Sequence, residues 1–417
     1  MTAAPLALLG ARTATGEQVD VALADGRITQ VSAAGTLHPA PGTATRDLTG
    51  YVLLPAPAEP HAHVDKALLA DRVPNRTGDL AGAIEAIEAI YPSMTDDDIL
   101  DRARRAVAIA IAHGYTQIRS HADCGETHGL RSVQALAQVR EELGGLVDLQ
   151  IVALMRASTT GPDGANQLAM LRDALACGAD LVGGAPHLEP DPMRAIAQFF
   201  DVAGELGRDV DLHTDEETVA STAGLAEMAR IVLSTGFPHL VSAGHCVSLG
   251  VQDEATARRT AEQVAAAGIV VIANPQTNLY LQARDDVTCK PRGLTAVQVL
   301  LNAGATVAAG SDNWRDPFNP MSRIDALETA SLMVSAGHLL PDAAYRSVSD
   351  AVRVAMGYEP VQVAAGSPAH LLAVQAGSLV EAIAAGPAQR IVLRAGAVVA
   401  ETTVRTTLHP ALAPVTA

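Results

Sequence analysis

The sequence predicts an α/β protein: a closed (β/α)8 TIM barrel that carries a small β domain formed by both chain ends. Two observations lead to this prediction. Short apolar runs recur along the middle of the chain with helix-like stretches between most of them, which is typical of parallel strands joined by helices. The chain ends instead show strand-like runs paired around tight turns. We expect a β-sandwich-like domain over residues 1–56 and 365–417, and a barrel over residues 57–364.

Eight apolar runs account for the barrel strands, and eight strand–helix units are the number that closes such a barrel. The runs are residues 51–57, 115–123, 147–154, 180–186, 209–216, 239–246, 268–275 and 305–312. Several stretches between them have recognisable helix ends. Residues 94–114 open with a Thr/Asp cap and residues 190–207 with a proline in the first turn, and both of them, like residues 253–268, finish in glycine.

The chain ends differ from the barrel in their turn residues. Residues 21–31 read "VALADGRITQV", in which Asp25-Gly26 is a typical two-residue hairpin turn. Residues 390–404 repeat this style, with a turn near Ala395-Gly396. A barrel needs no such hairpins, so we expect the two ends to meet in one small β domain.

The composition limits the partners. With 417 residues, a net charge of −17 and 48% hydrophobic residues, the chain is globular and acidic, so we expect it to bind neither nucleic acid nor a membrane. Its four cysteines form no CxxC pair, which argues against a disulfide framework and a thiolate zinc site. The chain shows neither a secretory leader nor an uninterrupted apolar span, and we expect a cytoplasmic protein. The prediction leaves a homo-oligomer open.

Polar side chains follow four of the predicted strands at their carboxyl ends. His61 and His63 stand two residues apart, so that both side chains leave the same side of a strand. The carboxyl ends of barrel strands face one side, which carries the active site. We therefore expect four histidines and two carboxylates to meet in the barrel mouth: His61, His63, His213, His245, Glu216 and Asp312.

This residue set indicates a catalytic metal site. Imidazole nitrogens with a carboxylate suit Zn²⁺ or Fe²⁺, and three or four protein ligands with one open position are typical of catalysis. A metal held in this way lowers the pKa of a bound water to about 7. A carboxylate beside that water can carry protons to a substrate. Glu216, three residues after His213, is the candidate for this proton transfer.

Four motifs in this order resemble the cytosine deaminase branch of the amidohydrolase superfamily, over nearly the whole chain. They are "EPHAHVDK" (59–66), "HTDE" (213–216), "SAGHC" (242–246) and "GSDNWRDPFNP" (310–320). The resemblance implies one divalent metal, Zn²⁺ or Fe²⁺. Its implied ligands are His61, His63, His213 and Asp312.

The resemblance also implies the reaction. Glu216 would protonate a ring nitrogen, while His245 and Asp312 would orient and deprotonate the attacking water. The implied reaction removes the exocyclic amino group of a pyrimidine-, triazine- or pterin-like heterocycle as ammonia. Binuclear members of the superfamily carry a carboxylated lysine after the fourth strand. The run at residues 180–190 contains no lysine, which favours one metal.

Two positions depart from the cytosine deaminase pattern. Cytosine deaminases carry a glutamine after the third strand, where this chain has Met155 and Arg156. They carry a second aspartate after the one of the eighth strand, where this chain has Asn313. Both changes argue against cytosine as substrate. Lys66 instead resembles the branch that acts on N-alkylamino-triazines.

We expect five residues to bind the substrate: Lys66, Arg156, Asn278, Asn313 and Trp314. Trp314 could stack on a flat heterocycle or cover the barrel mouth, and Asn278 could contact the ring or cap a turn. Two other functions stay open. One is cleavage of a cyclic amide or displacement of an alkylamine, and the other is non-catalytic binding of a small molecule. Glu216 argues against mere binding, because a binding protein needs no proton transfer.

Overall fold

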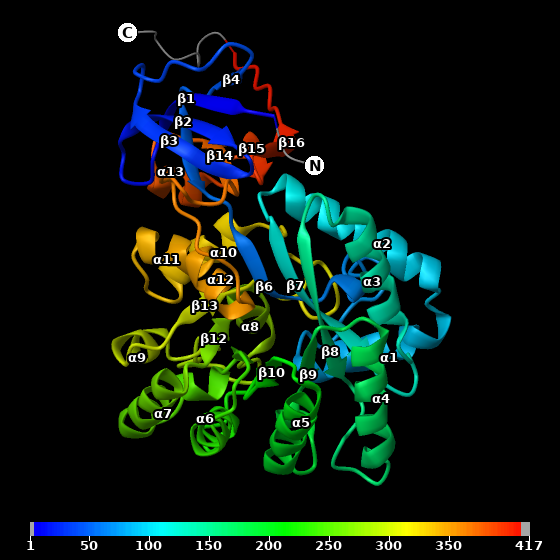
Figure 1. Cartoon of the computed structure of the whole chain (residues 1–417). Coiled ribbons are helices and arrows are strands. Elements are labelled where there is room, and N and C mark those ends of the chain that lie inside the picture. Colours follow the sequence, from blue (N-terminus) through cyan, green and yellow to red (C-terminus); the bar gives the residue numbers. More distant parts are fainter. Residues whose placement is uncertain (1–3, 410–417) are drawn as a thin grey trace.

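The computed structural model describes residues 4–409 of the chain. Within them the backbone forms two eight-stranded sheets. Figure 1 shows one sheet at the centre of a ring of helices, and the other beyond one end of that ring, built from both ends of the chain. The predicted fold class, a (β/α)8 barrel with a separate sheet formed by both termini, is confirmed.

The barrel strands are parallel and follow one another in chain order. They are β6 (Ala58–Ala62), β7 (Gln117–Cys124), β8 (Asp148–Met155), β9 (Leu181–Gly184), β10 (Val210–Thr214), β11 (Val241–His245), β12 (Val270–Ala273) and β13 (Val307–Ala309). Seven of the eight predicted runs contain such a strand. Every residue of β6, β7 and β9 to β13 is buried, because helices cover the outer face of the sheet and side chains fill the barrel.

The prediction for the first barrel strand was wrong. The apolar run at residues 51–57 contains β5 (Tyr51–Pro55), which pairs with strands of the other sheet. The barrel begins only at β6, after Ala56 and Pro57. Proline cannot donate a hydrogen bond to a neighbouring strand. Pro55 and Pro57 therefore separate β5, in one sheet, from β6, in the other. His61 thus lies in β6, a strand that is separate from the apolar run.

The second sheet has the order β16-β15-β14-β5-β1-β2-β3, with β4 beside β1. Its strands are β1 (Leu6–Arg12), β2 (Gln18–Ala24), β3 (Arg27–Ala33), β4 (Ala44–Asp47), β5, β14 (Leu371–Gln375), β15 (Arg390–Arg394) and β16 (Ala397–Thr402). Both expected hairpins form. Their turns have positive φ at both central residues, 50° and 75° at Asp25-Gly26 and 47° and 77° at Ala395-Gly396. The sandwich-like shape and the domain boundaries stay predictions.

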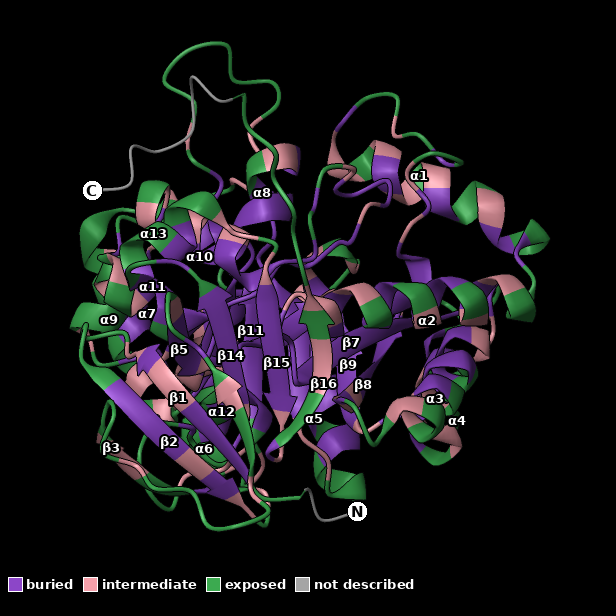
Figure 2. Ribbon diagram, turned by 90° about the horizontal axis from the view of Figure 1, so that it is seen from above, coloured by how far each residue is buried: buried purple, intermediate pink, exposed green. Residues whose placement is uncertain are grey.

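The helices surround the barrel, and Figure 2 shows their outer faces exposed and the central strands buried. They are α1 (Leu80–Ile90), α2 (Asp96–Ala112), α3 (Arg131–Leu143), α4 (Gly164–Cys177), α5 (Pro192–Leu206), α6 (Gly224–Thr235), α7 (Glu254–Ala267), α8 (Pro275–Leu281), α9 (Val297–Asn302), α10 (Ala326–Ser335), α11 (Pro341–Ser347), α12 (Asp350–Met356) and α13 (Leu379–Ala385). Thr95 caps α2, and Gly207 and Gly268 end α5 and α7 in the left-handed conformation. Over residues 4–409, none of the helices has the length and apolarity that crossing a membrane requires.

Candidate active site

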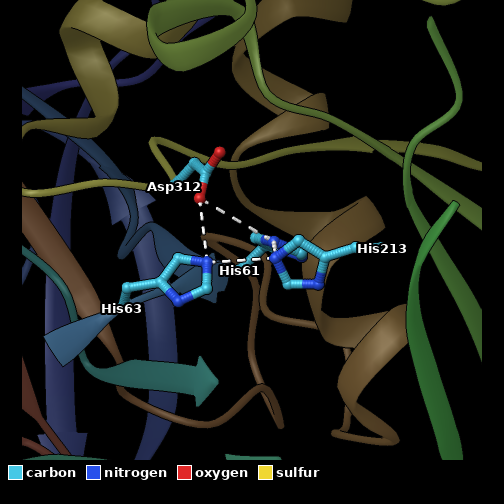
Figure 3. Close-up of side chains that lie close together, drawn as sticks. All are labelled: His61, His63, His213 and Asp312. Atoms are coloured by element: carbon cyan, nitrogen blue, oxygen red, sulfur yellow. Dashed lines mark hydrogen bonds and ion pairs between the residues drawn. The ribbon is translucent and has the colours of Figure 1, made fainter. Parts of the chain in front are cut away.

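Four side chains from three parts of the barrel converge in its mouth (Figure 3). His61 lies in β6, His63 follows that strand, His213 lies in β10, and Asp312 follows β13. The Nε2 atom of His213 lies 3.2 Å from that of His61 and 3.1 Å from that of His63. Oδ1 of Asp312 lies 3.2 Å from Nε2 of His63 and 3.8 Å from that of His61. Ligand atoms around a tetrahedral Zn²⁺ stand roughly 3.3 Å apart, given bonds of about 2.0 to 2.1 Å.

The protonation state of these groups also fits a cation. Burial holds the pKa of His63 and His213 well below the usual value and lowers that of His61 to about 3, so all three rings are neutral, as metal ligands must be. Within residues 4–409, no donor lies at ideal hydrogen-bond geometry to either carboxylate oxygen of Asp312, and the Thr277 hydroxyl is the nearby group that lowers its pKa against the effect of burial. A buried carboxylate with so few donors is costly, and a divalent cation among these four side chains would offset that cost.

Behind the ligands lies a second group of polar residues, of which Asp211 and Arg119 were not expected from the sequence. Oδ1 of Asp211 lies 3.9 Å from Nδ1 of His61 and 3.7 Å from Nε2 of His121, and its Oδ2 accepts a hydrogen bond of 2.7 Å from Arg119. Carboxylates behind metal-ligating histidines orient the rings. The alternation of strand residues could have revealed them, because Asp211 stands two residues before His213 and Arg119 two before His121.

The structure brings together Glu216 and His245, two of the residues that we expect to handle protons. Oε1 of Glu216 lies 3.4 Å from Nδ1 of His245, and Nε2 of that ring faces Oδ2 of Asp312 at 4.0 Å. Burial raises the pKa of Glu216 to about 8, so the carboxyl group keeps its proton at neutral pH. His245 and Asp312 both have positive φ, 68° and 64°, a conformation uncommon outside glycine that is often found at functional sites.

A cavity opens on this group. Its lining includes His63, His213 and Asp312 together with Glu216 and His245. The apolar side chains of Leu80, Ile84, Leu154, Met155 and Phe318 complete it on other sides. An apolar wall with a few convergent polar groups is typical of a site for a small ligand.

Three of the predicted substrate contacts, Lys66, Arg156 and Asn313, line this cavity. Lys66 is buried, and its Nζ lies 2.7 Å from Oδ1 of Asp123 and 3.0 Å from Nδ1 of His63. Arg156 has only long ion pairs, at 3.4 Å to Glu88 and 3.9 Å to Asp123. Its guanidinium therefore keeps donor capacity for a ligand.

The other two predicted contacts lie outside the cavity lining. Trp314 is completely buried in the hydrophobic core, where its indole nitrogen donates a hydrogen bond of 2.6 Å to the Ser311 hydroxyl. Phe318, four residues later in the same loop, is the ring that lines the cavity. The Asn278 side-chain amide lies 3.0 Å from Nδ1 of His245 and 3.5 Å from Oε1 of Glu216. Asn278 thus contacts both Glu216 and His245.

Known proteins share this arrangement. Residues 73–355 match the model of the amidohydrolase family. A pterin deaminase of Rhizobium rhizogenes is 33% identical over 390 residues, which are 92% of this chain and 88% of the relative. The chain belongs to the amidohydrolase family. Members of this family are metal-dependent, and the chain is therefore a hydrolase of carbon–nitrogen bonds. The expected branch of the superfamily is confirmed.

Two solved structures resemble this amidohydrolase along almost its whole length. A 5-methylcytosine deaminase from Klebsiella pneumoniae is 28% identical with a TM-score of 0.88, covering 97% of this chain and 100% of its own. An N-isopropylammelide isopropylaminohydrolase from Burkholderia multivorans is 28% identical with a TM-score of 0.83, covering 96% and 99%. The names of the three relatives give three different substrates. The substrate of this amidohydrolase therefore has to be inferred from the residues that line its cavity.

Proposed function

We propose that this amidohydrolase is a mononuclear deaminase that removes an exocyclic amino group from a nitrogen heterocycle as ammonia. The observation that carries the proposal is the buried Glu216 beside His245, in the cavity that the candidate ligands His63, His213 and Asp312 also line. Addition of water to the ring carbon is favoured when the neighbouring ring nitrogen takes up a proton, and a carboxyl group with a pKa near 8 can donate one at neutral pH.

One divalent ion, Zn²⁺ or Fe²⁺, would be held by His61, His63, His213 and Asp312. When bound, it would supply Lewis-acid chemistry and lower the pKa of water in its coordination sphere. The number of ions is inferred from the ligand groups. The other possible ligand group within residues 4–409 combines His61 and His121 with Asp211, whose carboxylate already forms an ion pair with Arg119.

The residues of this chain divide the proton transfers among themselves. Asp312 takes the proton of the water that attacks the ring carbon, and Glu216 gives its proton to the neighbouring ring nitrogen. His245 lies between the two carboxylates and orients the water. The amino nitrogen receives the proton that Asp312 took from the water, the bond between the ring carbon and this nitrogen breaks with the electron pair going to the nitrogen, and ammonia leaves. As the carbonyl forms, the proton of the added hydroxyl returns to Glu216, which restores both carboxyl groups.

Pterin-like rings are the substrate class that we favour. The pterin deaminase is 33% identical to this chain, above the 28% of the two solved relatives. The position after the third barrel strand carries Met155 and Arg156, and both line the cavity. The planar fork of Arg156 can hold a carbonyl or carboxylate group of a substituted ring. Lys66 and Asn313 supply further polar contacts.

A second candidate is the displacement of an alkylamine from a triazine. It is favoured by the isopropylaminohydrolase neighbour and by Lys66, which lies beside a ligand histidine. Both reactions are hydrolyses at a ring carbon and differ in the amine that leaves. Product analysis therefore separates them.

The test supplies the metal-loaded protein with pterin, cytosine and N-isopropylammelide at equal concentrations and measures ammonia and isopropylamine. We expect ammonia from pterin at the highest kcat/KM and little turnover of cytosine. Isopropylamine as the fastest product would favour the second candidate, and cytosine as the best substrate would contradict the substrate class. Glu216→Gln protein, purified in parallel, controls for contaminating hydrolases.

A further inference from the structure

The barrel closes between its first and last strands with few backbone hydrogen bonds. Among residues 4–409, β6 and the segment after β13 share one isolated bridge, between Ala62 and Asp312, in which Asp312 N donates to His61 O at 2.9 Å and His63 N donates to Asp312 O at 3.3 Å. Pro60 has no N–H group to add to this boundary. We call the boundary between residues 58–63 and 307–312 the seam. His61 and Asp312 face each other across it.

The carboxylate of Glu59 spans the seam in place of a continuous ladder. Its Oε1 accepts hydrogen bonds from His61 N and Ser311 N, both at 3.1 Å. Its Oε2 accepts from Ser311 N at 3.0 Å, from the Ser311 hydroxyl, and from the Tyr115 hydroxyl at 3.3 Å. The Glu59 side chain is buried, so water does not compete for these donors. One carboxylate thus holds the backbone at His61 and directly before Asp312.

The neighbouring residues are built around this carboxylate. A Cβ atom at Gly310 would lie 2.6 Å from Oε1 of Glu59 and 3.3 Å from Cβ of His61, so only glycine lets the end of β13 approach so closely. The Ser311 hydroxyl, a donor to Glu59, also accepts from the indole of Trp314. The contacts of Glu59 therefore belong to a packed arrangement of both seam strands.

We propose that Glu59 is a positioning residue that sets the distance between the His61 and Asp312 ligands. The proposal rests on the metal centre of the proposed function and adds to it a residue that touches neither metal nor substrate. The role requires a carboxylate, because both of its oxygens face N–H or O–H donors. A glutamine would turn an amide N–H₂ group against one of those donors. The seam would then shift, and the ligands with it.

The test measures metal binding by Glu59→Gln protein, which needs no substrate. Residues behind metal ligands typically change metal affinity by about 10- to 100-fold when substituted. We expect Zn²⁺ affinity, measured by competition with a chelator, to fall within that range. We also expect the visible absorption bands of Co²⁺-loaded protein to shift, because those bands report ligand geometry. Near-UV circular dichroism should match the wild type.

Asp20→Asn is the matched control. Asp20 is a buried carboxylate of the other sheet and accepts hydrogen bonds from the backbone N–H groups of Gly10, Gly35 and Leu37. Its substitution should lower the unfolding midpoint and leave both the Zn²⁺ affinity and the Co²⁺ spectrum unchanged. A general loss of stability would therefore be separated from a change at the ligands.

Ser311→Ala is the second variant, and it decides the matter if Glu59→Gln protein does not fold. It removes one of the donors to Glu59 and should shift metal affinity and spectrum in the same direction by a smaller factor. Wild-type affinity and spectrum in the folded variants would overturn the role of Glu59. Wild-type protein that binds no divalent metal would instead overturn the proposed function.

Discussion

Two buried carboxylates, one in the sheet of the chain ends and one in the barrel mouth, have opposite surroundings. Asp20, in the sheet formed by the chain ends, accepts hydrogen bonds from three backbone N–H groups. Asp312, in the barrel mouth, has no backbone N–H donor and only the Thr277 hydroxyl nearby, in the part of the chain that the structure describes. Both are almost completely inaccessible to solvent. A buried polar group that is satisfied within the chain stabilises the fold, whereas one left with few donors is available to a ligand.

The largest expected effect breaks the ligand group itself. His61→Ala should lose most of the bound metal, and activity should fall by more than about 1,000-fold, because a catalytic metal stabilises the transition state by several kcal/mol. Elemental analysis and rate measurements on the same preparation check this. Two metals per chain in active wild-type protein, or full activity without metal, would contradict the mononuclear centre.

The next effect separates chemistry from metal binding. Glu216→Gln keeps the size and hydrogen bonding of the side chain but cannot pass on a proton. We expect metal content to stay at the wild-type level and kcat to fall by roughly 10²- to 10⁴-fold, the usual contribution of general acid–base catalysis. Loss of the metal would make Glu216 a ligand. A near-normal rate would direct attention to His245 as the proton carrier.

A smaller effect concerns pH. The acid form of Glu216 exists below its pKa of about 8, so kcat/KM should fall as pH rises through that value. A bound cation favours the carboxylate and would move this fall to a lower pH. The charge of Arg156 lowers this pKa. Arg156→Met should therefore move the alkaline limb to higher pH. A pH profile of kcat/KM for both proteins measures the shift, and an unmoved limb would assign the limb to another group.

The smallest expected effect lies in the core. Trp314→Phe removes a hydrogen bond to Ser311 and some buried volume, which should lower the free energy of unfolding by about 1 to 2 kcal/mol. KM should stay unchanged, since Phe318 and not Trp314 lines the cavity. Urea unfolding and steady-state kinetics test both parts. A raised KM with wild-type stability would show that Trp314 contributes to substrate binding after all.

Local patterns explain why most of the fold could be predicted. The hairpin turns at Asp25-Gly26 and Ala395-Gly396 and the glycine helix ends depend on neighbouring residues alone. The alternation of strands and helices then limited the arrangement to a barrel. The division of residues 51–62 between two sheets could not be predicted, because an apolar run does not specify the sheet in which it pairs.

The candidate site was predictable to the extent that strand ends place it. The rule that barrel strands end on one face predicts that His61, His63, His213 and Asp312 meet in the barrel mouth, and the resemblance to the cytosine deaminase branch selects them as metal ligands. The role of Glu59 could not be predicted from the sequence. This role depends on the contact with Ser311, which stands 252 positions away. Trp314 and Phe318 share a loop, and only packing decides which ring faces the cavity.

The pairing of β5 with β14 has a consequence for synthesis of the chain. Pro55 lies opposite Leu371, 316 positions later, and the barrel lies between them. At about 5 to 20 residues per second, a ribosome takes roughly 16 to 63 seconds to cover that distance. During this interval the apolar strand "YVLLP" has an unpaired edge, which is a template for association with another chain. The first barrel strand follows β5 after two residues. It is therefore synthesised while the neighbouring sheet still lacks its C-terminal strands β14 to β16.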